Sequence, residues 1–330
     1  MTVAGGGPKA AGDLSVVIVS FNCRDLLLSC LTSLHGIDGE IIVVDNASSD
    51  QTVTTLRTRH PDVAVIEMGK NAGFGRASNR GMEAASGRYI LLLNPDTVVS
   101  PGALRVLVDF LDEHPGAGVV APRLVYPDGA DQGTARAFPT AAAALFGRRS
   151  PLTRWFPSNR WSRRYLTGRQ RSTNTPFEIE WVSGAAMMVR ADVIGRLGGF
   201  DPDFFMHWED AELCHRTRRS GFEIWCEPRA TVIHEEGGSR RGWPPRQVWH
   251  FHRGAYLFWK KTHTGWSTRV TLPLVAGALL ARAAIIIARD TARGAFGGFR
   301  QSPLGSPSPR SEEGQRSESV EEEASRRAES

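Results

Sequence analysis

Short apolar runs alternate with stretches of helical spacing along the first third of the chain. The apolar runs cover 14–20, 40–45, 63–68 and 88–93. Runs of this kind are typical of strands buried on both faces of a sheet. Helices are predicted between and after them, at 24–34, 52–59, 76–86 and 104–113. The alternation predicts an α/β fold with a Rossmann-like, mostly parallel central sheet that is flanked by helices and has right-handed crossovers.

A polar side chain follows each of these predicted strands. Asn22, Asp45, Asn71 and Asp96 stand at these positions. Because the carboxyl ends of parallel strands share one edge, the four side chains are expected to line one crevice, where open α/β sheets bind ligands. In Asn94-Pro95-Asp96 the proline ends the strand, since it cannot donate to a central ladder. Asp96 is then either a turn-forming residue or a ligand of a hard cation.

Two common nucleotide-binding motifs are missing from the sequence. No G-x-G-x-x-G follows the first predicted strand, which disfavours a dinucleotide-binding dehydrogenase. No P-loop is present either. The function therefore has to be sought in other residues.

The second half of the chain repeats the pattern less regularly. Strands are predicted at 118–122, 180–189 (with a break at Ser-Gly), 224–227 and 230–234, and helices at 191–197 and 211–220. Glu209 and Asp210 stand directly before the second of these helices. They are either capping residues that suit the helix dipole or a general base held near a substrate hydroxyl. His234 ends the last strand, and it is either structural or, with Asp96, part of a ligand set for Mn²⁺ or Mg²⁺.

The composition is that of a globular protein with polar ends. The chain has 330 residues, of which 41% are hydrophobic and 23% charged, and a net charge of +5. Its four cysteines show no C-x-x-C spacing and no secretory signal precedes them, so reduced thiols are expected rather than a disulfide framework or a zinc site. Residues 1–12 and 300–330 have few apolar residues to bury and are predicted to be disordered.

Arginines and aromatic residues are interleaved between residues 148 and 171, without any acid. This stretch suits anionic lipid headgroups or a polyprenyl diphosphate. A solvated insertion loop is the alternative. Such a composition also suits single-stranded RNA, but no nucleic-acid motif accompanies it, so no nucleic-acid partner is expected.

An apolar segment, 272–288, follows near the C-terminal end. A membrane-spanning helix needs about 20 apolar residues. This segment is shorter, and it carries Arg282 near its middle. A helix over 268–293 that lies in or against the membrane interface is therefore predicted, because its four arginines suit the headgroup region. The alternative is a C-terminal helix that packs on the domain.

Seven segments, in order along the chain, carry a family resemblance. They are VVIVSFN, VVDNASSD, NAGFGRASNRG, LLLNPD, WVSGAAMMVR, GGFDPDFFMHWEDAELCHR and the segment around His234. Together they resemble the inverting, GT-A-fold glycosyltransferases of family 2, over about Leu14 to Lys261. The resemblance implies a GT-A domain over 13–265, with a nucleotide-sugar half at about 13–120 and an acceptor half at about 121–265.

The resemblance also implies a nucleotide-sugar site. Its residues are Ser20, Asn22, Asp45, Asn46, Asn71, Arg76, Asn94 and Asp96. Asp45 matches the acid that recognises the base. Asn94-Pro95-Asp96 occupies the D-x-D position, where Mg²⁺ or Mn²⁺ bridges the donor diphosphate. Because Asn replaces the first acid, Asp96 is expected to carry most of the metal contact, with His234 as a second ligand.

The implied reaction is a single displacement with inversion. Asp210 matches the general base that takes the proton of the acceptor hydroxyl, and Glu209 flanks it. Positions near the acceptor are Trp181, Gly184 and Trp208. No covalent sugar–enzyme intermediate is needed in such a reaction.

Within the family, the pattern resembles the bacterial rhamnosyltransferases most. Its nearest match is to the actinobacterial group that transfers L-rhamnose from dTDP-L-rhamnose to GlcNAc-diphospho-polyprenol in arabinogalactan linker synthesis. A transferase using a UDP- or GDP-hexose for polysaccharide or O-antigen synthesis is the alternative, and a non-catalytic glycan-binding protein of the same fold is a remote one. The resemblance implies a peripheral protein on the cytoplasmic face of the bacterial plasma membrane.

Overall fold

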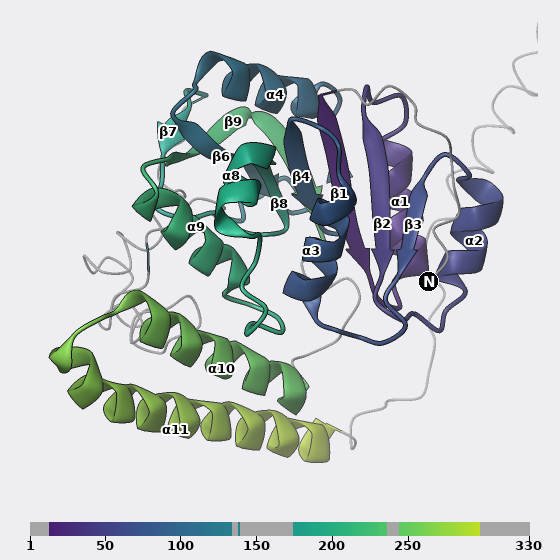
Figure 1. Ribbon diagram of the computed structural model, residues 1–330. Helices are drawn as coiled ribbons and strands as arrows, with labels where there is room; N and C mark the ends of the chain where they lie inside the picture. Colours follow the sequence, from purple (N-terminus) through teal and green to yellow (C-terminus); the bar gives the residue numbers. More distant parts are fainter. Residues whose placement is uncertain (1–12, 134–137, 139–173, 236–243, 298–330) are drawn as a thin grey trace, which may run out of the picture. The chain divides into compact units, whose positions relative to one another are not determined.

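A computed structural model describes residues 13–133, 138, 174–235 and 244–297 (Figure 1). The predictions for 1–12, for 300–330 and for the arginine-rich stretch 148–171 lie outside these residues. The chain divides after Ile287 into two units. The fold and the site described below belong to the first, apart from residues 288–297 at the end of the last helix.

Four parallel strands form one half of the sheet, in the order β3-β2-β1-β4. The strands are β1 (Leu14–Ser20), β2 (Glu40–Asp45), β3 (Ala64–Glu67) and β4 (Tyr89–Leu93), and the helices between them are α1 (Arg24–Ser33), α2 (Thr52–Arg59) and α3 (Phe74–Ala84). β1 and β4 are buried along their whole length, as the apolar runs predict. The strand–helix alternation predicted for this half is confirmed.

The other half of the sheet is mixed, with parallel and antiparallel pairs. Its elements are β5 (Thr97–Val99), α4 (Ala103–Glu113), β6 (Ala117–Val125), β7 (Phe177–Glu178), β8 (Ala186–Arg190), α8 (Ala191–Leu197), α9 (Glu209–Arg219) and β9 (Glu223–His234). β8 runs antiparallel to both β4 and β6. The N–H of Asn94 donates to the carbonyl oxygen of Ala185 at 2.9 Å. β8 therefore enters the sheet at the edge where β4 ends, and this fixes its direction.

The two strands predicted at 224–227 and 230–234 form the single strand β9. β9 pairs with β6 on both sides of Pro228, and the register shifts from Pro122–Glu227 to Arg123–Thr231. Proline has no N–H to donate, so the residues around it bulge out while the pairing resumes beyond. The strand predicted over 180–189 is shortened to β8, because the chain turns at Gly184 before it enters the sheet.

Helices cover both faces of the sheet (Figure 1). One apolar cluster packs Leu27 of α1 and Phe110 of α4 against the sheet, and the other packs Met82 of α3 and Leu213 of α9. Full burial of one such side chain contributes about 1.5–3 kcal/mol. The two clusters thus fix the sheet and the start of α9 relative to each other.

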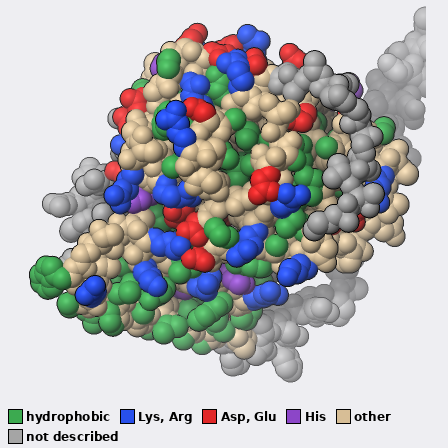
Figure 2. Space-filling model, in the orientation of Figure 1, with side chains coloured by type: hydrophobic (Ala, Val, Ile, Leu, Met, Phe, Trp, Pro, Cys, Tyr) green, Lys and Arg blue, Asp and Glu red, His purple; other side chains and the backbone are tan. Residues whose placement is uncertain are grey.

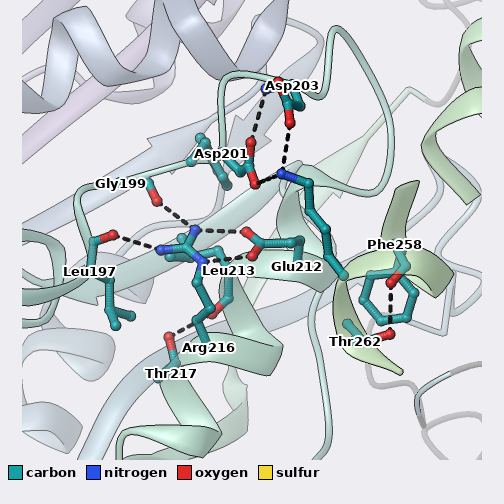
Figure 3. A network of polar contacts seen from close by, with 12 residues as sticks. Leu197, Gly199, Asp201, Asp203, Glu212, Leu213, Arg216, Thr217, Phe258 and Thr262 are labelled. Carbon is teal, nitrogen blue, oxygen red and sulfur yellow. Dashed lines mark hydrogen bonds and ion pairs between the residues drawn. The ribbon is translucent and has the colours of Figure 1, made fainter. Parts of the chain in front are cut away.

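A partly buried ion pair of Arg216 and Glu212 lies where α9 meets the end of α8 (Figure 3). Arg216 donates to both carboxylate oxygens of Glu212, and also to the carbonyl oxygens of Leu197 and Gly199, all at 2.7 Å. Glu212 is buried. Glu212 holds the guanidinium of Arg216 in position within α9, and the Arg216 bonds to Leu197 and Gly199 connect α9 to the end of α8.

Two further helices follow β9, α10 (Pro245–Thr262) and α11 (Trp266–Gly297). The helix predicted at 268–293 lies within α11. In the described part of the chain, α11 is the one helix long and apolar enough to cross a membrane, by length and composition only; the segment is Thr268–Thr291, with a mean hydropathy of 2.2. Lys261 of α10 donates to Asp201 at 2.6 Å and to Asp203 at 2.7 Å (Figure 3). α10 therefore supports the loop that leads into α9.

Candidate active site

The carboxyl ends of β1, β2 and β4 meet the start of β8 at one edge of the sheet. β1 and β2 end in register at Ser20 and Asp45, and β4 runs parallel to β1 on its other side. The edge therefore brings together the polar residues that follow the three strands. The three strands end at one edge, as expected; that Asn22, Asp45, Asn71 and Asp96 line one crevice stays a prediction.

Asn46 joins the loop after β2 to the loop before α3. Its side-chain amide donates to Asn71 Oδ1 at 3.2 Å, and its Oδ1 accepts from the N–H of Ala72 at 2.8 Å. Asn71 Oδ1 also accepts from the N–H of Gly73 at 3.1 Å. Asn46 and Asn71, both predicted for the nucleotide-sugar site, are thus in direct contact.

Asp45 presents a carboxylate oxygen that lacks a partner. Its Oδ2 accepts from the N–H of Ser48 at 2.9 Å, whereas its Oδ1 is buried and has no hydrogen-bond partner among the described residues. Leaving a buried acceptor unpaired costs about 1–3 kcal/mol. Asp45 Oδ1 is therefore well suited to accept an N–H from a ligand.

A cleft of about 470 Å³ opens beside the ends of β1 and β2. Its lining residues are Asn22, Cys23, Arg24, Asp25, Leu26, Ser49, Asp50 and Gln51. Asn22 and Gln51 have left-handed backbones, with φ of 51° and 65°. Such conformations cost about 1–3 kcal/mol each in a non-glycine residue and tend to occur at ligand sites. Asn22 Oδ1 accepts from the N–H of Ser49 at 2.8 Å, which helps to hold the loop in this shape.

Asp96 and His234 face each other across two paired strands. β5 and β9 pair with Thr97 opposite His234, and His234 Nε2 lies 3.4 Å from Asp96 Oδ1. This Asp96 oxygen is buried and has no hydrogen-bond partner among the described residues. Within the same residues, no third His, Cys, Asp or Glu completes a metal-binding group. A carboxylate and an imidazole with open positions fit a divalent cation that takes its other ligands from phosphate and water.

Gln132 orients the His234 ring and was missed by the sequence reasoning. Its side-chain amide donates to the carbonyl oxygen of His234, so its Oε1 is the atom that meets His234 Nδ1, at 2.9 Å. A carbonyl oxygen accepts only, so Nδ1 must carry the proton. In the neutral ring, Nε2 is then the unprotonated nitrogen, and it faces Asp96, as a metal ligand requires. Gln132 lies after a turn and belongs to no sequence motif, so the sequence contains no local signal that identifies it.

Gln132→Leu is expected to weaken Mn²⁺ binding by about 10–100-fold, the usual cost of losing the group that orients a metal-binding histidine. Isothermal titration with Mn²⁺ in the presence of a nucleoside diphosphate measures the change. Gln132→Glu is the matched control, because a carboxylate still accepts from Nδ1–H and retains more of the affinity. Equal affinity in the Leu variant and the unaltered protein would contradict this role.

Asp210 lies in the first turn of α9 and reaches back to the start of β8. Its Oδ2 accepts from the N–H of Gly184 at 2.9 Å. A Cβ at Gly184 would lie 3.4 Å from the Asp210 Cβ, in ordinary van der Waals contact, so the two segments are adjacent. Because Ala185 is bonded to Asn94, this contact brings Asp210 to the sheet edge that carries Asp96.

Glu209 is neutral beside Asp210. It is buried, and its Oε2 has no hydrogen-bond partner among the described residues. Burial, and next the charge of Asp210, raise the pKa of the Glu209 carboxyl to about 8. Burial thus favours the neutral form of Glu209 next to Asp210, and a neutral acid beside a carboxylate is an arrangement in which the carboxylate can serve as a general base.

Aromatic side chains surround the start of α9. Trp208 has a left-handed backbone with φ of 77° and lies 5.5 Å, between ring centroids, from Phe251 of α10. The N–H of Phe74 donates to the carbonyl oxygen of Phe205 at 2.8 Å. The loop 201–208 is thus held between α3 and α10. Trp181, the other predicted acceptor residue, is buried, and its role stays a prediction.

Two predicted donor-site residues have structural partners in this arrangement. Ser20 is fully buried, and its hydroxyl lies 3.4 Å from Cys23 Sγ. Arg76 donates to the carbonyl oxygen of Pro202 at 3.1 Å and is exposed. Ser20 thus supports the loop after β1, and Arg76 links α3 to the loop before α9. Their contacts with a nucleotide sugar stay predictions.

Comparison with known proteins identifies the family. The sequence model of glycosyl transferase family 2 matches residues 15–194, more than half of the 330 residues. The chain belongs to glycosyl transferase family 2. This glycosyltransferase is 30% identical over 237 residues to the N-acetylglucosaminyl-diphospho-decaprenol L-rhamnosyltransferase of Mycobacterium tuberculosis, covering 68% of this chain and 76% of that protein. It is 25% identical over 230 residues to the low-salt glycan biosynthesis hexosyltransferase Agl10 of Haloferax volcanii, covering 68% and 67%.

Solved structures share the fold of this glycosyltransferase. The mannosyltransferase PcManGT from Pyrobaculum calidifontis, in complex with GDP-Man and Mn²⁺, has a TM-score of 0.53 at 17% identity and covers 91% of this chain and 85% of its own. GalNAc-T7 with UDP, GalNAc and Mn²⁺ has a TM-score of 0.55 at 16% identity, covering 77% and 49%. The fold is the GT-A fold, as the resemblance implies.

Proposed function

We propose that this glycosyltransferase transfers L-rhamnose from dTDP-L-rhamnose to a GlcNAc-diphospho-polyprenol, with inversion, in the synthesis of a cell-wall linker. The observation that carries the proposal is the facing pair of Asp96 and His234, with Asp210 at the same edge of the sheet. The 30% identity to the mycobacterial rhamnosyltransferase supports this choice of sugar and acceptor.

Asp45 and Asp96 bind opposite ends of the donor in this proposal. They follow β2 and β4, which are separated by β1, so about 10 Å lies between the two strand ends. This is the scale of a nucleoside diphosphate from base to phosphate. Asp45 Oδ1 accepts from the N–H of the base, and Asn94 and Asp96 lie at the diphosphate.

Asp210 performs the proton transfer. Asp96 and His234 would hold Mg²⁺ or Mn²⁺, and the bound cation would neutralise the charge that develops on the leaving diphosphate. Asp210 takes the proton of the acceptor hydroxyl while the hydroxyl oxygen bonds to the anomeric carbon and the bond to the diphosphate breaks. Neutral Glu209 leaves the charge on Asp210. A single displacement of this kind inverts the configuration.

The acceptor in this proposal is a membrane lipid. We therefore assign the enzyme to the cytoplasmic face of the bacterial plasma membrane, where sugar nucleotides are made. The exposed, apolar helix α11 supports membrane association, since only 6% of its most apolar window is buried.

A donor screen tests the proposed function. dTDP-L-rhamnose, UDP-glucose, UDP-galactose and GDP-mannose are each offered with a short-chain GlcNAc-diphospho-lipid, with and without Mg²⁺ or Mn²⁺, and the product is identified by mass spectrometry. Product is expected from dTDP-L-rhamnose only, and only with metal. Product from a hexose donor alone would replace the rhamnosyl assignment by a hexosyl one. If no donor gave a product, the alternative of a non-catalytic glycan-binding protein would be favoured.

A further inference from the structure

One face of α11 consists of apolar side chains that nothing in the described part of the chain covers. Val270, Leu274, Leu280 and Ile285 are 60%, 71%, 55% and 58% exposed. The other exposed residues between Arg269 and Arg289 are Pro, Gly and Ala, so this outer face is free of charge. At 1.5 Å per residue it is about 28 Å long. We call these four side chains and the small residues between them the outer face of α11.

The charge that interrupts the apolar segment lies on the opposite face. Arg282 is half-buried, and its guanidinium donates to His252 Nε2 of α10 at 3.3 Å. His252 Nδ1 lies 2.7 Å from the carbonyl oxygen of Val248 and donates to it, which leaves Nε2 as an acceptor. Ala283, next to Arg282, is 5% exposed. Arg282 therefore ties α11 to α10 and does not disturb the outer face.

α10 carries cationic side chains and lies beside α11. Figure 1 shows α11 running beside α10, and α10 exposes Arg246, Arg253, Lys260 and Lys261. Four cations on one helix are too costly to bury in hydrocarbon. Figure 2 shows hydrophobic side chains gathered along the α11 edge of the molecule, with Lys and Arg side chains beside them. An apolar face bordered by cations is the pattern of a helix that lies in an anionic interface.

The same hairpin holds the loop that precedes the general base. Arg253 of α10 donates to the carbonyl oxygen of Asp203 at 2.8 Å, and the ring of His250 stacks on Phe205 at 4.4 Å between centroids. A Cβ at Gly254 would lie 2.7 Å from the carbonyl oxygen of His207, so α10 and the loop are in close contact. With the Lys261 bridge, these contacts fasten the loop 201–208 to α10.

We propose that the outer face of α11 docks in the plane of an anionic phospholipid bilayer, and that the α10–α11 hairpin thereby holds the loop 201–208 next to the bilayer surface. This inference rests on the proposed function, because it explains how a lipid-linked acceptor reaches Asp210. The charge-free outer face fits the hydrocarbon at the bilayer surface, and the cations beside it fit the anionic headgroups. The acceptor sugar then approaches from the membrane side, past Trp208.

Vesicle flotation tests the docking face. The full chain is mixed with phosphatidylcholine vesicles, with and without phosphatidylglycerol. The double variant Leu274→Glu/Ile285→Glu is expected to lower the partition coefficient by at least about 100-fold, because it puts two charges on the inserted face. The matched control Thr54→Glu/Ala84→Glu carries the same charge change on exposed positions of α2 and α3, and it should bind as the unaltered protein does. Circular dichroism confirms that both variants are folded.

Three results separate this inference from its alternatives. Unchanged flotation of the α11 variant overturns the docking face. Retention of the unaltered protein in the membrane after alkaline carbonate extraction indicates a spanning helix and overturns the in-plane orientation. Transfer to a water-soluble GlcNAc-diphosphate acceptor should be the same in the α11 variant and the unaltered protein. If the unaltered protein does not transfer sugar to this acceptor, the proposed function is refuted, but the flotation result still supports the docking face.

Discussion

Asp210→Asn is expected to lower the rate of sugar transfer by about 100- to 10,000-fold, the range that a positioned general base supplies. The amide has the same shape as the carboxylate and retains an oxygen for the N–H of Gly184, which Asp210 binds at 2.9 Å. It cannot take the proton of the acceptor hydroxyl. Donor binding should be unchanged, because the proposed donor contacts are made by Asp45 and Asp96 and not by Asp210. Single-turnover transfer and a titration with dTDP measure the two quantities separately.

Glu209→Gln is the matched control for this variant. Burial holds the pKa of Glu209 near about 8, so at pH 7 a neutral acid is replaced by a neutral amide of the same size. Transfer should fall by less than about 10-fold, far less than the loss expected from removing a general base. Full activity in Asp210→Asn, together with a large loss in Glu209→Gln, would exchange the roles of the two acids.

The sequence predicts the donor half of the site better than the acceptor half. Asp45 and Asp96 each follow a buried run in a parallel strand, and the carboxyl ends of parallel strands have to meet at one edge. Their placement follows from local pattern alone. The direction of β8 does not, because it depends on the contact between Asn94 and Ala185 rather than on any property of the strand itself.

Gln132 shows why the surroundings of a site are harder to predict than its main residues. It lies 102 positions from His234 in the chain, and only the pairing of β6 with β9 brings the two side chains together. Glutamine has no characteristic spacing to a histidine. Arg282 is a second example. In the sequence, the charge of Arg282 argues against burial of the apolar segment. In the structure, Arg282 contacts His252 and leaves the outer face of α11 without a charge.

Asp96→Asn is expected to abolish metal-dependent transfer, with Mn²⁺ affinity reduced by at least about 100-fold, because the one carboxylate of the pair is lost. Titration with Mn²⁺ and the metal dependence of transfer measure this effect. Asn94→Ala is the matched control. It alters the first position of the same motif but leaves both Asp96 and His234 in place, so a loss of less than about 10-fold is expected. Equal losses in the two variants would refute Asp96 as the main metal-binding residue.

The same Asp96→Asn variant should be more stable than the unaltered protein when no metal is present. Asp96 Oδ1 is buried without a hydrogen-bond partner among the described residues and lies 3.4 Å from His234 Nε2. In the neutral ring Nε2 carries no proton, because Nδ1 donates to Gln132 Oε1. An amide at this position donates to that nitrogen and removes the cost of about 1–3 kcal/mol for an unpaired acceptor. In the presence of a chelator, the midpoint of thermal unfolding should therefore be a few degrees higher for Asp96→Asn than for the unaltered protein. Added Mn²⁺ should raise the midpoint of the unaltered protein only. If Asp96 had a purely structural role, its replacement would lower the midpoint of unfolding, because contacts on which the fold depends would be lost.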